Sequence, residues 1–186
     1  ATYQALAVAN IETLTGLGVD RILVTCAHCL NALSREYAQL GGTFRLTHHT
    51  QLLNRLVREK RLTLTPPEAD ERVQLTYHDP CYLGRHNGEY DAPRELLAAL
   101  PGTDLVEMEH SRSTSMCCGG GGARMWTEER IGTRISDARL EEASATGAGV
   151  IATGCPYCSI MLGDAAAAAG TAPEVRDVAH LVLAGV

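Results

Sequence analysis

Residues 150–158 read VIATGCPYC, a short apolar run that leads directly into a pair of cysteines two residues apart. An apolar run of this length after a glycine-containing turn is typical of a buried parallel strand. Pro156 suits the first turn of a helix, so the cysteine pair lies where a strand passes into a helix. Further strand patterns alternate with helical patterns along the chain, which predicts an α/β fold of Rossmann-like modules with a mostly parallel sheet.

The expected elements follow from periodicity and turn signals. Strands are expected at residues 22–25, 44–47, 73–78, 104–108, 150–153 and 174–177. Helices are expected at residues 30–40, 52–61, 93–100, 123–146 and 159–169. Residues 63–72 contain Pro66-Pro67 and four charged side chains, and this composition indicates a linker between modules.

The stretch that ends in the cysteine pair has a counterpart 129 residues upstream, where residues 22–29 read ILVTCAHC. The similarity continues for about 40 residues without a gap. We therefore predict two modules: residues 1–61 as the C-terminal part of a first module, and residues 62–186 as a complete second module. The first module is expected to be truncated, so that the cysteines preceding its C-x-x-C pair are missing and its site is incomplete.

Composition excludes several classes of protein. The 186 residues are 45% hydrophobic and 20% charged, as in an ordinary globular protein. A net charge of −6 offers no basic surface for nucleic acid. No apolar run approaches the roughly 20 residues that span a bilayer, and no secretory signal pattern is present. We expect a cytoplasmic location, or one at the cytoplasmic face of the membrane as part of a larger protein attached through an upstream region.

Five of the seven cysteines form one extended pattern, made of a single cysteine, an adjacent pair and a C-x-x-C pair: Cys81, Cys117, Cys118, Cys155 and Cys158. Adjacent side chains normally diverge, so two neighbouring sulfurs converge more readily on a cluster of several metal atoms than on one ion. All five lie at a predicted strand end or helix start, the edge where open α/β sheets bind ligands. The pattern therefore predicts an iron–sulfur cluster and a function in electron transfer.

Residues near the cysteines are candidates for contacts with the cluster. Gly119 and Gly120 open a glycine loop that lets the backbone approach a bulky group and donate N–H groups to sulfur. A phosphate loop is the alternative, but no Lys-Ser or Lys-Thr follows the glycines. Arg85 is expected to bind an anionic group or offset thiolate charge, with surface ion pairing as an equal alternative. His78 is interpreted as a structural histidine, and Trp126 is expected in the core.

Three other interpretations of the cysteines are weighed against a cluster. A disulfide framework is disfavoured by the odd number of cysteines and the lack of a secretion signal. Zinc is favoured by C-x-x-C pairs at strand–helix junctions, but zinc takes four ligands where five are offered. At Cys26 and Cys29 alone, zinc stays open. A thioredoxin-like pair at Cys155 and Cys158 would leave the other three cysteines of the pattern without a role.

The cysteine spacing resembles a known family. A gap of 35 residues separates Cys81 from Cys117-Cys118-Gly119, and a gap of 36 residues leads to the final C-x-x-C. This arrangement resembles the cysteine-rich CCG domain of B/D-type subunits of heterodisulfide reductase. The domain also occurs in iron–sulfur subunits of glycolate oxidase, anaerobic glycerol-3-phosphate dehydrogenase and lactate-utilisation proteins. The likeness covers essentially the whole chain, and Cys26-Ala27-His28-Cys29 resembles the closing C-x-x-C of a first CCG module, with Ala27 where Pro is usual.

The resemblance implies a cofactor and a function. It implies that the five patterned cysteines ligate a [4Fe–4S] cluster, of the noncubane type in heterodisulfide reductases and cubane or another metal in other members. It implies an iron–sulfur oxidoreductase subunit that passes electrons between a flavoprotein and quinone, or to a disulfide acceptor. Its redox partners would be a ferredoxin-like iron–sulfur domain and a flavoprotein. The alternative is a zinc-stabilised structural or interaction module without redox activity.

Overall fold

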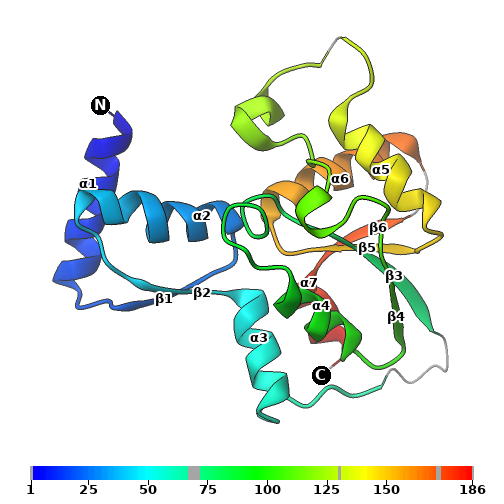
Figure 1. Ribbon diagram of the computed structural model, residues 1–186, viewed down its shortest axis with the longest axis horizontal. Coiled ribbons are helices and arrows are strands. Elements are labelled where there is room, and N and C mark those ends of the chain that lie inside the picture. Colours follow the sequence, from blue (N-terminus) through cyan, green and yellow to red (C-terminus); the bar gives the residue numbers. More distant parts are fainter. Residues whose placement is uncertain (1, 67–71, 130, 171–172, 186) are drawn as a thin grey trace.

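The computed structural model describes residues 2–66, 72–129, 131–170 and 173–185, and it places two parallel sheets side by side (Figure 1). The larger sheet has four strands in the order β4-β3-β5-β6, and the smaller sheet pairs β1 with β2. Neighbouring strands run parallel in both sheets. The prediction of an α/β fold with parallel strands is confirmed.

The strands are short and lie close to their predicted positions. They are β1 (Arg21–Val24), β2 (Arg45–His48), β3 (Val73–His78), β4 (Thr103–Val106), β5 (Val150–Thr153) and β6 (Glu174–Asp177). The helices are α1 (Thr2–Gly16), α2 (Ala27–Asn31), α3 (His49–Arg58), α4 (Asp91–Ala98), α5 (Ile135–Ala145), α6 (Pro156–Ala169) and α7 (Val178–Ala184). Every strand lies within two residues of its predicted range, because apolar runs between turn residues are a local signal.

Helices cover both faces of the larger sheet, which is why most residues of its central strands, β3 and β5, are buried. On one face, Leu140 of α5 and Leu162 of α6 pack with Ile151 of β5. On the opposite face, Leu96 of α4 and Val182 of α7 belong to a second apolar cluster. Figure 1 shows the same arrangement, with α5 and α6 above the sheet and α4 and α7 below it.

The repeat in the sequence is also a repeat of structure. Strand β1 begins at Arg21 and β5 begins at Val150, which is 129 positions later. The same spacing relates the starts of β2 and β6, of α2 and α6, and of α3 and α7. The strand registers match as well, since Arg21 pairs with Arg45 as Val150 pairs with Glu174. The proposed boundary between residues 61 and 62 stays a prediction, and residues 67–71 of the predicted linker lie outside the described residues.

One predicted helix is wrong. The sequence predicts a single helix over residues 123–146, but the chain forms a 3-10 segment at Gly121–Trp126, and α5 begins only at Ile135. Gly122, Ala123 and Gly132 have φ angles of +64°, +62° and +72°, which a right-handed helix cannot contain. The expected burial of Trp126 is wrong for the same reason, since its side chain is carried out on this loop and is 79% exposed.

The other helices begin up to three residues before their predicted ranges. The segment expected at residues 30–40 starts as α2, continues as a π turn at Ala32–Glu36 and closes as a 3-10 turn at Tyr37–Leu40. Gly41 ends it with a φ of 90°, the left-handed conformation that glycine adopts without strain. No helix among the described residues combines the length and the apolar character needed to cross a bilayer.

Candidate metal centre

The five patterned cysteines lie at one edge of the larger sheet, beyond the carboxyl ends of its strands. Cys81 follows β3 after two residues, and Cys155 follows β5 and is the N-cap of α6. Cys158 lies in the first turn of α6, and Cys117 and Cys118 lie on the loop that follows β4. Because parallel strands end at the same edge, loops from separate parts of the sequence bring these sulfurs together.

Six of the cysteine side chains form a continuous series in which each one is hydrogen-bonded to the next. The order along the series is Cys81, Cys117, Cys118, Cys158, Cys155 and Cys26. All seven cysteines are free thiols. The series therefore contains all five cysteines of the predicted pattern, both members of the adjacent pair included, together with Cys26 from the smaller sheet. Cys29 is exposed and lies outside the series.

Cys117 is one of two cysteines in this series that accept hydrogen bonds from both of their neighbours. Hydrogen bonds from Cys118 and then from Cys81 hold the pKa of Cys117 far below its usual range, assisted by backbone N–H groups. One of these is the amide of Gly119, whose nitrogen lies 3.3 Å from the Cys117 sulfur. The hydrogen bond that Cys118 donates to Cys117 raises the pKa of Cys118 to about 11. Cys117 is thus poised as a thiolate, the form that binds metal.

Cys155 is the second cysteine that accepts from both of its neighbours. Hydrogen bonds from Cys158 and then from Cys26 lower the pKa of the Cys155 thiol, and His28 adds a further one. Correspondingly, donation to Cys118 and Cys155 raises the pKa of Cys158. Cys155 also caps α6, where the positive end of the helix dipole favours a thiolate. The two acceptors come from different loops, so each half of the series carries one sulfur ready to bind a metal.

The glycine loop brings backbone close to these sulfurs. A Cβ on Gly120 would lie 3.6 Å from the Cys118 sulfur and 3.2 Å from Cγ of Met161, which is tighter than ordinary contact. Gly119 has a φ of +89°, a conformation that side chains rarely allow. The loop therefore needs glycine both for its path and for its distance from the sulfurs. A donor set of closely spaced thiols beside backbone N–H groups fits a large thiolate-bound cluster.

Arg85 lies beside the site and supports one of its loops. Its guanidinium donates to the carbonyl oxygens of Ser115, at 2.7 Å, and Ser113, at 3.4 Å. These bonds join the turn after Cys81 to the segment that leads into Cys117. Binding of an anionic group by Arg85 stays a prediction, as do direct contacts of Gly119 and Gly120 with a cofactor.

Comparison with known sequences assigns the family. The sequence model of the CCG family, described as a cysteine-rich domain, matches residues 1–34 and 75–163. This chain belongs to the CCG cysteine-rich domain family. The matched segments contain all seven cysteines, so the resemblance inferred from cysteine spacing is confirmed.

Relatives of the CCG chain are iron–sulfur proteins and redox proteins by name. The chain is 44% identical to the probable iron-sulfur-binding oxidoreductase FadF of Bacillus subtilis, over 97% of its own length and 25% of that protein. It is 40% identical to EtfAB:quinone oxidoreductase of Syntrophomonas wolfei, over 97% of the chain and 26% of that protein. It is 33% identical to one of the subunits of the dihydromethanophenazine:CoB–CoM heterodisulfide reductase of Methanosarcina barkeri, over 96% of the chain and 44% of that protein. The chain thus spans about a quarter to under half of the length of these relatives.

A buried ion pair fixes the turn that carries Cys81, and sequence reasoning missed it. Arg94 of α4 donates two bonds to the carboxylate of Asp79, at 2.7 and 2.8 Å, and two more to Glu107. Asp79 also accepts a bond from the backbone N–H of Arg112, at 2.7 Å. One side chain thus ties β3, α4 and the loop after β4 together. A charge at position 94 looks in the sequence like part of a solvated helix face, so no local signal identifies this role.

His78 and Arg139 form a second buried group beside the cysteines, and the role of Arg139 was also missed. Arg139 of α5 is completely buried, and its Nε donates to Nδ1 of His78 at 3.1 Å. A ring nitrogen of His78 and the sulfurs of Cys118 and Cys158 lie within 4.8 Å of one another. Burial, and then the charge of Arg139, lower the pKa of His78 to about 4. The i,i+3 pair of Arg139 with Glu142 resembles an ordinary surface pair in the sequence.

The two CCG repeats meet at equivalent positions. Cys26 and Cys155 are separated by the repeat distance, and their sulfurs lie within 4.8 Å of each other and of a ring nitrogen of His28. The His28 ring also lies against Tyr82, with centroids 4.2 Å apart, and against Tyr157, at 4.9 Å. The Cys26 sulfur thus lies close to Cys155 of the second repeat, and a metal site at Cys26 and Cys29 stays a prediction.

Two buried histidines, His48 and His49, lie where β2 ends and α3 begins. His49 Nε2 lies 3.1 Å from a carboxylate oxygen of Asp177. His48 Nδ1 lies 2.8 Å from the Thr50 hydroxyl, and a Cβ on Gly154 would lie 3.2 Å from the His48 ring. Burial, and then the charge of His49, lower the pKa of His48 to about 4. These side chains support the backbone that precedes Cys155.

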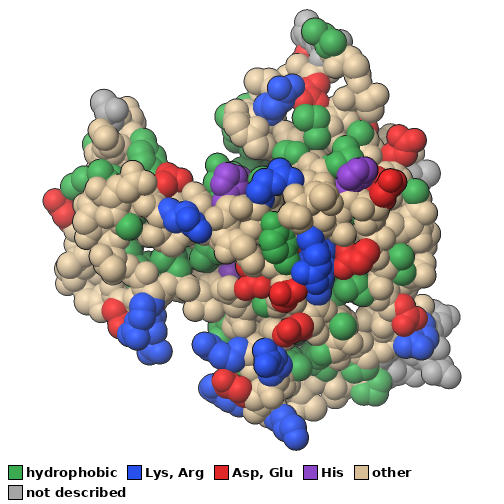
Figure 2. Space-filling view, viewed as in Figure 1, with side chains coloured by type: hydrophobic (Ala, Val, Ile, Leu, Met, Phe, Trp, Pro, Cys, Tyr) green, Lys and Arg blue, Asp and Glu red, His purple; other side chains and the backbone are tan. Residues whose placement is uncertain are grey.

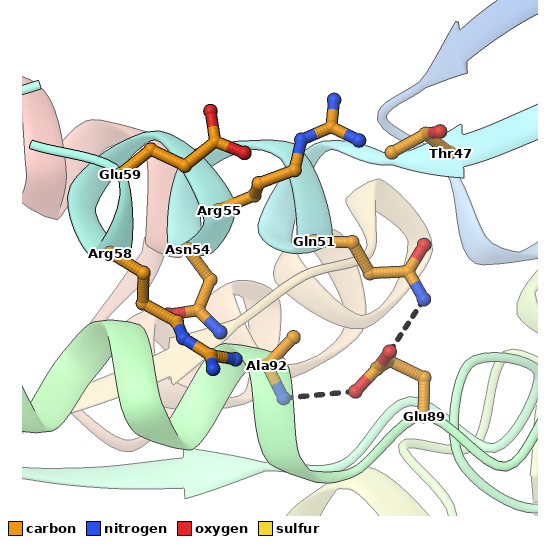
Figure 3. A pocket seen from close by; sticks show the side chains of 8 residues that line it. All are labelled: Thr47, Gln51, Asn54, Arg55, Arg58, Glu59, Glu89 and Ala92. Atoms are coloured by element: carbon orange, nitrogen blue, oxygen red, sulfur yellow. Dashed lines mark hydrogen bonds between the residues drawn. The ribbon is translucent and has the colours of Figure 1, made fainter. Parts of the chain in front are cut away.

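A polar hollow of about 680 Å³ lies between α3 and α4, and none of the cysteines lines it (Figure 3). Glu89 lies at the edge of this hollow. Its carboxylate accepts one hydrogen bond from the Gln51 side chain and another, at 2.9 Å, from the backbone N–H of Ala92. Figure 2 shows basic and acidic side chains interspersed in this part of the surface. Glu89 thus ties α3 of the first repeat to the start of α4, which keeps the turn after Cys81 in place.

Proposed function

We propose that this chain is the cluster-binding part of an iron–sulfur oxidoreductase subunit. The proposed ligands of a [4Fe–4S]-type cluster are Cys81, Cys117, Cys118, Cys155 and Cys158. The observation that carries the proposal is the continuous series of free sulfurs in which both adjacent cysteines take part. A single tetrahedral ion takes four ligands, whereas a cluster of several metal atoms can use all five.

A cluster held here, when bound, accepts and releases electrons one at a time. The chain prepares the site for it in three ways. Hydrogen bonds lower the pKa values of Cys117 and Cys155, which favours the thiolate form that binds metal. The amide of Gly119 donates to the Cys117 sulfur and disperses its negative charge. Arg94 and Arg139 fix the loops that carry the sulfurs, so the ligands are already close together before metal arrives.

The electron donor and acceptor follow, in this proposal, from the named relatives. One relative is an EtfAB:quinone oxidoreductase, which supports transfer from a flavoprotein to quinone. Another is a heterodisulfide reductase subunit, which supports a disulfide as acceptor. We expect other redox subunits as partners, a ferredoxin-like iron–sulfur domain among them. A relative named as a probable membrane-anchored ferredoxin supports work at a membrane as part of a longer protein. The cytoplasm, or the cytoplasmic face of the membrane, is the location that we expect.

A zinc-stabilised module without redox activity is the second candidate. The observation that favours it is the grouping of Cys26, His28 and Cys155, because two sulfurs and an imidazole nitrogen suit zinc. Such a site would join the two repeats and hold them in a fixed arrangement. It would also take Cys155 away from the proposed cluster.

Metal analysis of the chain purified without oxygen separates the two candidates. The cluster predicts about four iron and about four acid-labile sulfide per chain, with visible absorption and an EPR signal in one oxidation state. Zinc at about one per chain, with no visible absorption, would contradict the proposal. Iron together with zinc would assign the cluster to the five patterned cysteines and the zinc to Cys26, His28 and Cys29, which leaves Cys155 with the cluster.

Two serine substitutions test the ligand set. Cys118→Ser removes a sulfur from the middle of the series, so iron content should fall or the EPR signal should change. Cys29→Ser is the matched control, because Cys29 is exposed and lies outside the series. A Cys118→Ser protein with unchanged iron, sulfide and EPR would show that four cysteines suffice. The assignment of five ligands would then be wrong.

A further inference from the structure

His78 lies at the end of β3, buried between Arg139 and the sulfurs, and the proposed ligand set leaves it without a role. Its Nδ1 accepts from Nε of Arg139 at 3.1 Å. Its other nitrogen, Nε2, is buried and has no hydrogen-bond partner among the described residues. The sulfurs of Cys118 and Cys158 lie within 4.8 Å of the ring nitrogen that groups with them. Nε2 is thus the nitrogen free to interact with sulfur.

The contact with Arg139 decides where the proton of His78 lies. A guanidinium carries only donors, so the atom it contacts must offer a lone pair. Nδ1 of His78 therefore carries no hydrogen while this contact holds. A doubly protonated ring would set an N–H of His78 against an N–H of Arg139. The ring is consequently neutral, with its one proton on Nε2.

Arg139 is held firmly enough to impose this choice. It is completely buried, and its remaining nitrogens donate to the carbonyl of His110 at 3.0 Å, to the hydroxyl of Ser115 at 3.1 Å and to the carboxylate of Glu142. Each bond uses a different direction of the planar guanidinium, so the side chain cannot turn without losing several of them. Ser115 lies two residues before Cys117, so the same arginine also anchors the loop of the adjacent cysteines.

We propose that Arg139 fixes His78 as the tautomer with its proton on Nε2, and that this N–H is donated to the sulfur of Cys118 or Cys158. His78 is then a positioning residue that tunes the site, and it is not a metal ligand. The effect on the reduction potential rests on the proposed cluster, whereas the assigned tautomer of His78 does not. Ligation through Nε2 would need a lone pair at an atom that already carries the proton.

The direction of the tuning follows from charge. Reduction adds an electron to a thiolate-bound cluster and makes its sulfurs stronger acceptors. A hydrogen bond to a ligand sulfur therefore stabilises the reduced state more than the oxidised state and raises the reduction potential. Removing the donor should lower the potential without removing a ligand, so iron content should stay the same.

Redox titration of variants tests this role. His78→Leu keeps an apolar side chain in the space and removes the donor. We expect the reduction equilibrium constant to fall by at least tenfold, which is about 59 mV for a one-electron couple. His78→Gln places a carboxamide N–H near the position of Nε2, and it should recover most of the loss. Thr76→Val is the control, because its buried hydroxyl two residues earlier on β3 also lacks a partner among the described residues. Equal potentials in His78→Leu and Thr76→Val would overturn the proposal.

Two spectroscopic readouts remain decisive if the leucine variant does not fold. In metal-free protein labelled with ¹⁵N-histidine, NMR should show His78 with an unprotonated Nδ1 and a protonated Nε2. The reverse tautomer would overturn the proposal even if the cluster assignment stands. In the iron-loaded protein labelled with ¹⁵N-histidine, pulsed EPR should show a weak ¹⁵N coupling that is absent from His78→Gln, whose carboxamide nitrogen is not labelled. A strong coupling of a directly bound nitrogen would overturn it. Absence of iron with the expected tautomer would refute the cluster alone.

Discussion

The ion pair of Arg94 with Asp79 is the contact whose loss should destabilise the protein most clearly. Both side chains are almost completely buried, at 7% and 3% exposed, and two bonds of 2.7 and 2.8 Å join them. Arg94→Met keeps much of the apolar stem and leaves the Asp79 charge without its cation. Breaking a buried pair by removing one partner typically costs about 3–5 kcal/mol.

The surroundings place the expected cost in the lower part of that range. Asp79 keeps one bond from the backbone N–H of Arg112, and Glu107 is 40% exposed and can return to water. We therefore expect Arg94→Met to lower the free energy of unfolding by about 3 kcal/mol. The measurement is urea denaturation of the metal-free protein under nitrogen, followed by circular dichroism.

Two controls make the result specific. Arg58→Met breaks an exposed pair with Glu95, at 3.5 Å, and should cost no more than about 0.5 kcal/mol. Adding Asp79→Asn to Arg94→Met removes the stranded charge and should restore part of the stability. If Arg94→Met lowers the free energy of unfolding no more than Arg58→Met does, the Arg94–Asp79 pair does not hold the turn before Cys81, and the reasoning is refuted.

Two further predictions concern the glycine loop and the buried histidines. Gly119→Ala should lower iron content, because a Cβ there would meet Met161 and the backbone of Ser136 at 3.4 Å and would have to adopt a φ of +89°. Gly122→Ala, also at positive φ but with open space around its Cβ, is the control, and equal iron content in the two variants would contradict the prediction. The free energy of unfolding of the metal-free protein should fall as pH falls from about 6.5 to about 4. His48 should contribute roughly 1–3 kcal/mol of this loss. In that pH range the histidine takes up a proton in the unfolded chain, whereas buried His48 in the folded protein does not. His48→Gln should show a flatter dependence in urea denaturation at several pH values, and an unchanged slope would rule out this origin.

Much of the fold could be predicted because its signals are local. Strands β1 and β5 are mainly apolar and follow glycine-containing turns, and the C-x-x-C pairs stand where a strand passes into a helix. The repeat of 129 residues predicted that equivalent strands would recur, and the starts and registers of β1, β2, β5 and β6 agree with it. The single helix expected over residues 123–146 does not form. Its charged and small side chains favour a helix in the sequence, but glycines and loop contacts set the backbone path in the first part of this range.

The sequence by itself determined the family, the order of strands and helices along the chain and the five cysteines that meet, because spacing along the chain specifies where each loop begins. Only the tertiary structure decided that Cys26 turns toward Cys155 while Cys29 stays exposed, and that Arg94 and Arg139 are buried. A charged side chain can be buried only where hydrogen-bonding or oppositely charged groups are in place to compensate it. For Arg94 and Arg139, Asp79 and His78 are such groups, and both are distant in sequence. His78 and Arg139 are 61 positions apart, so their contact exists only once β3 and α5 lie together.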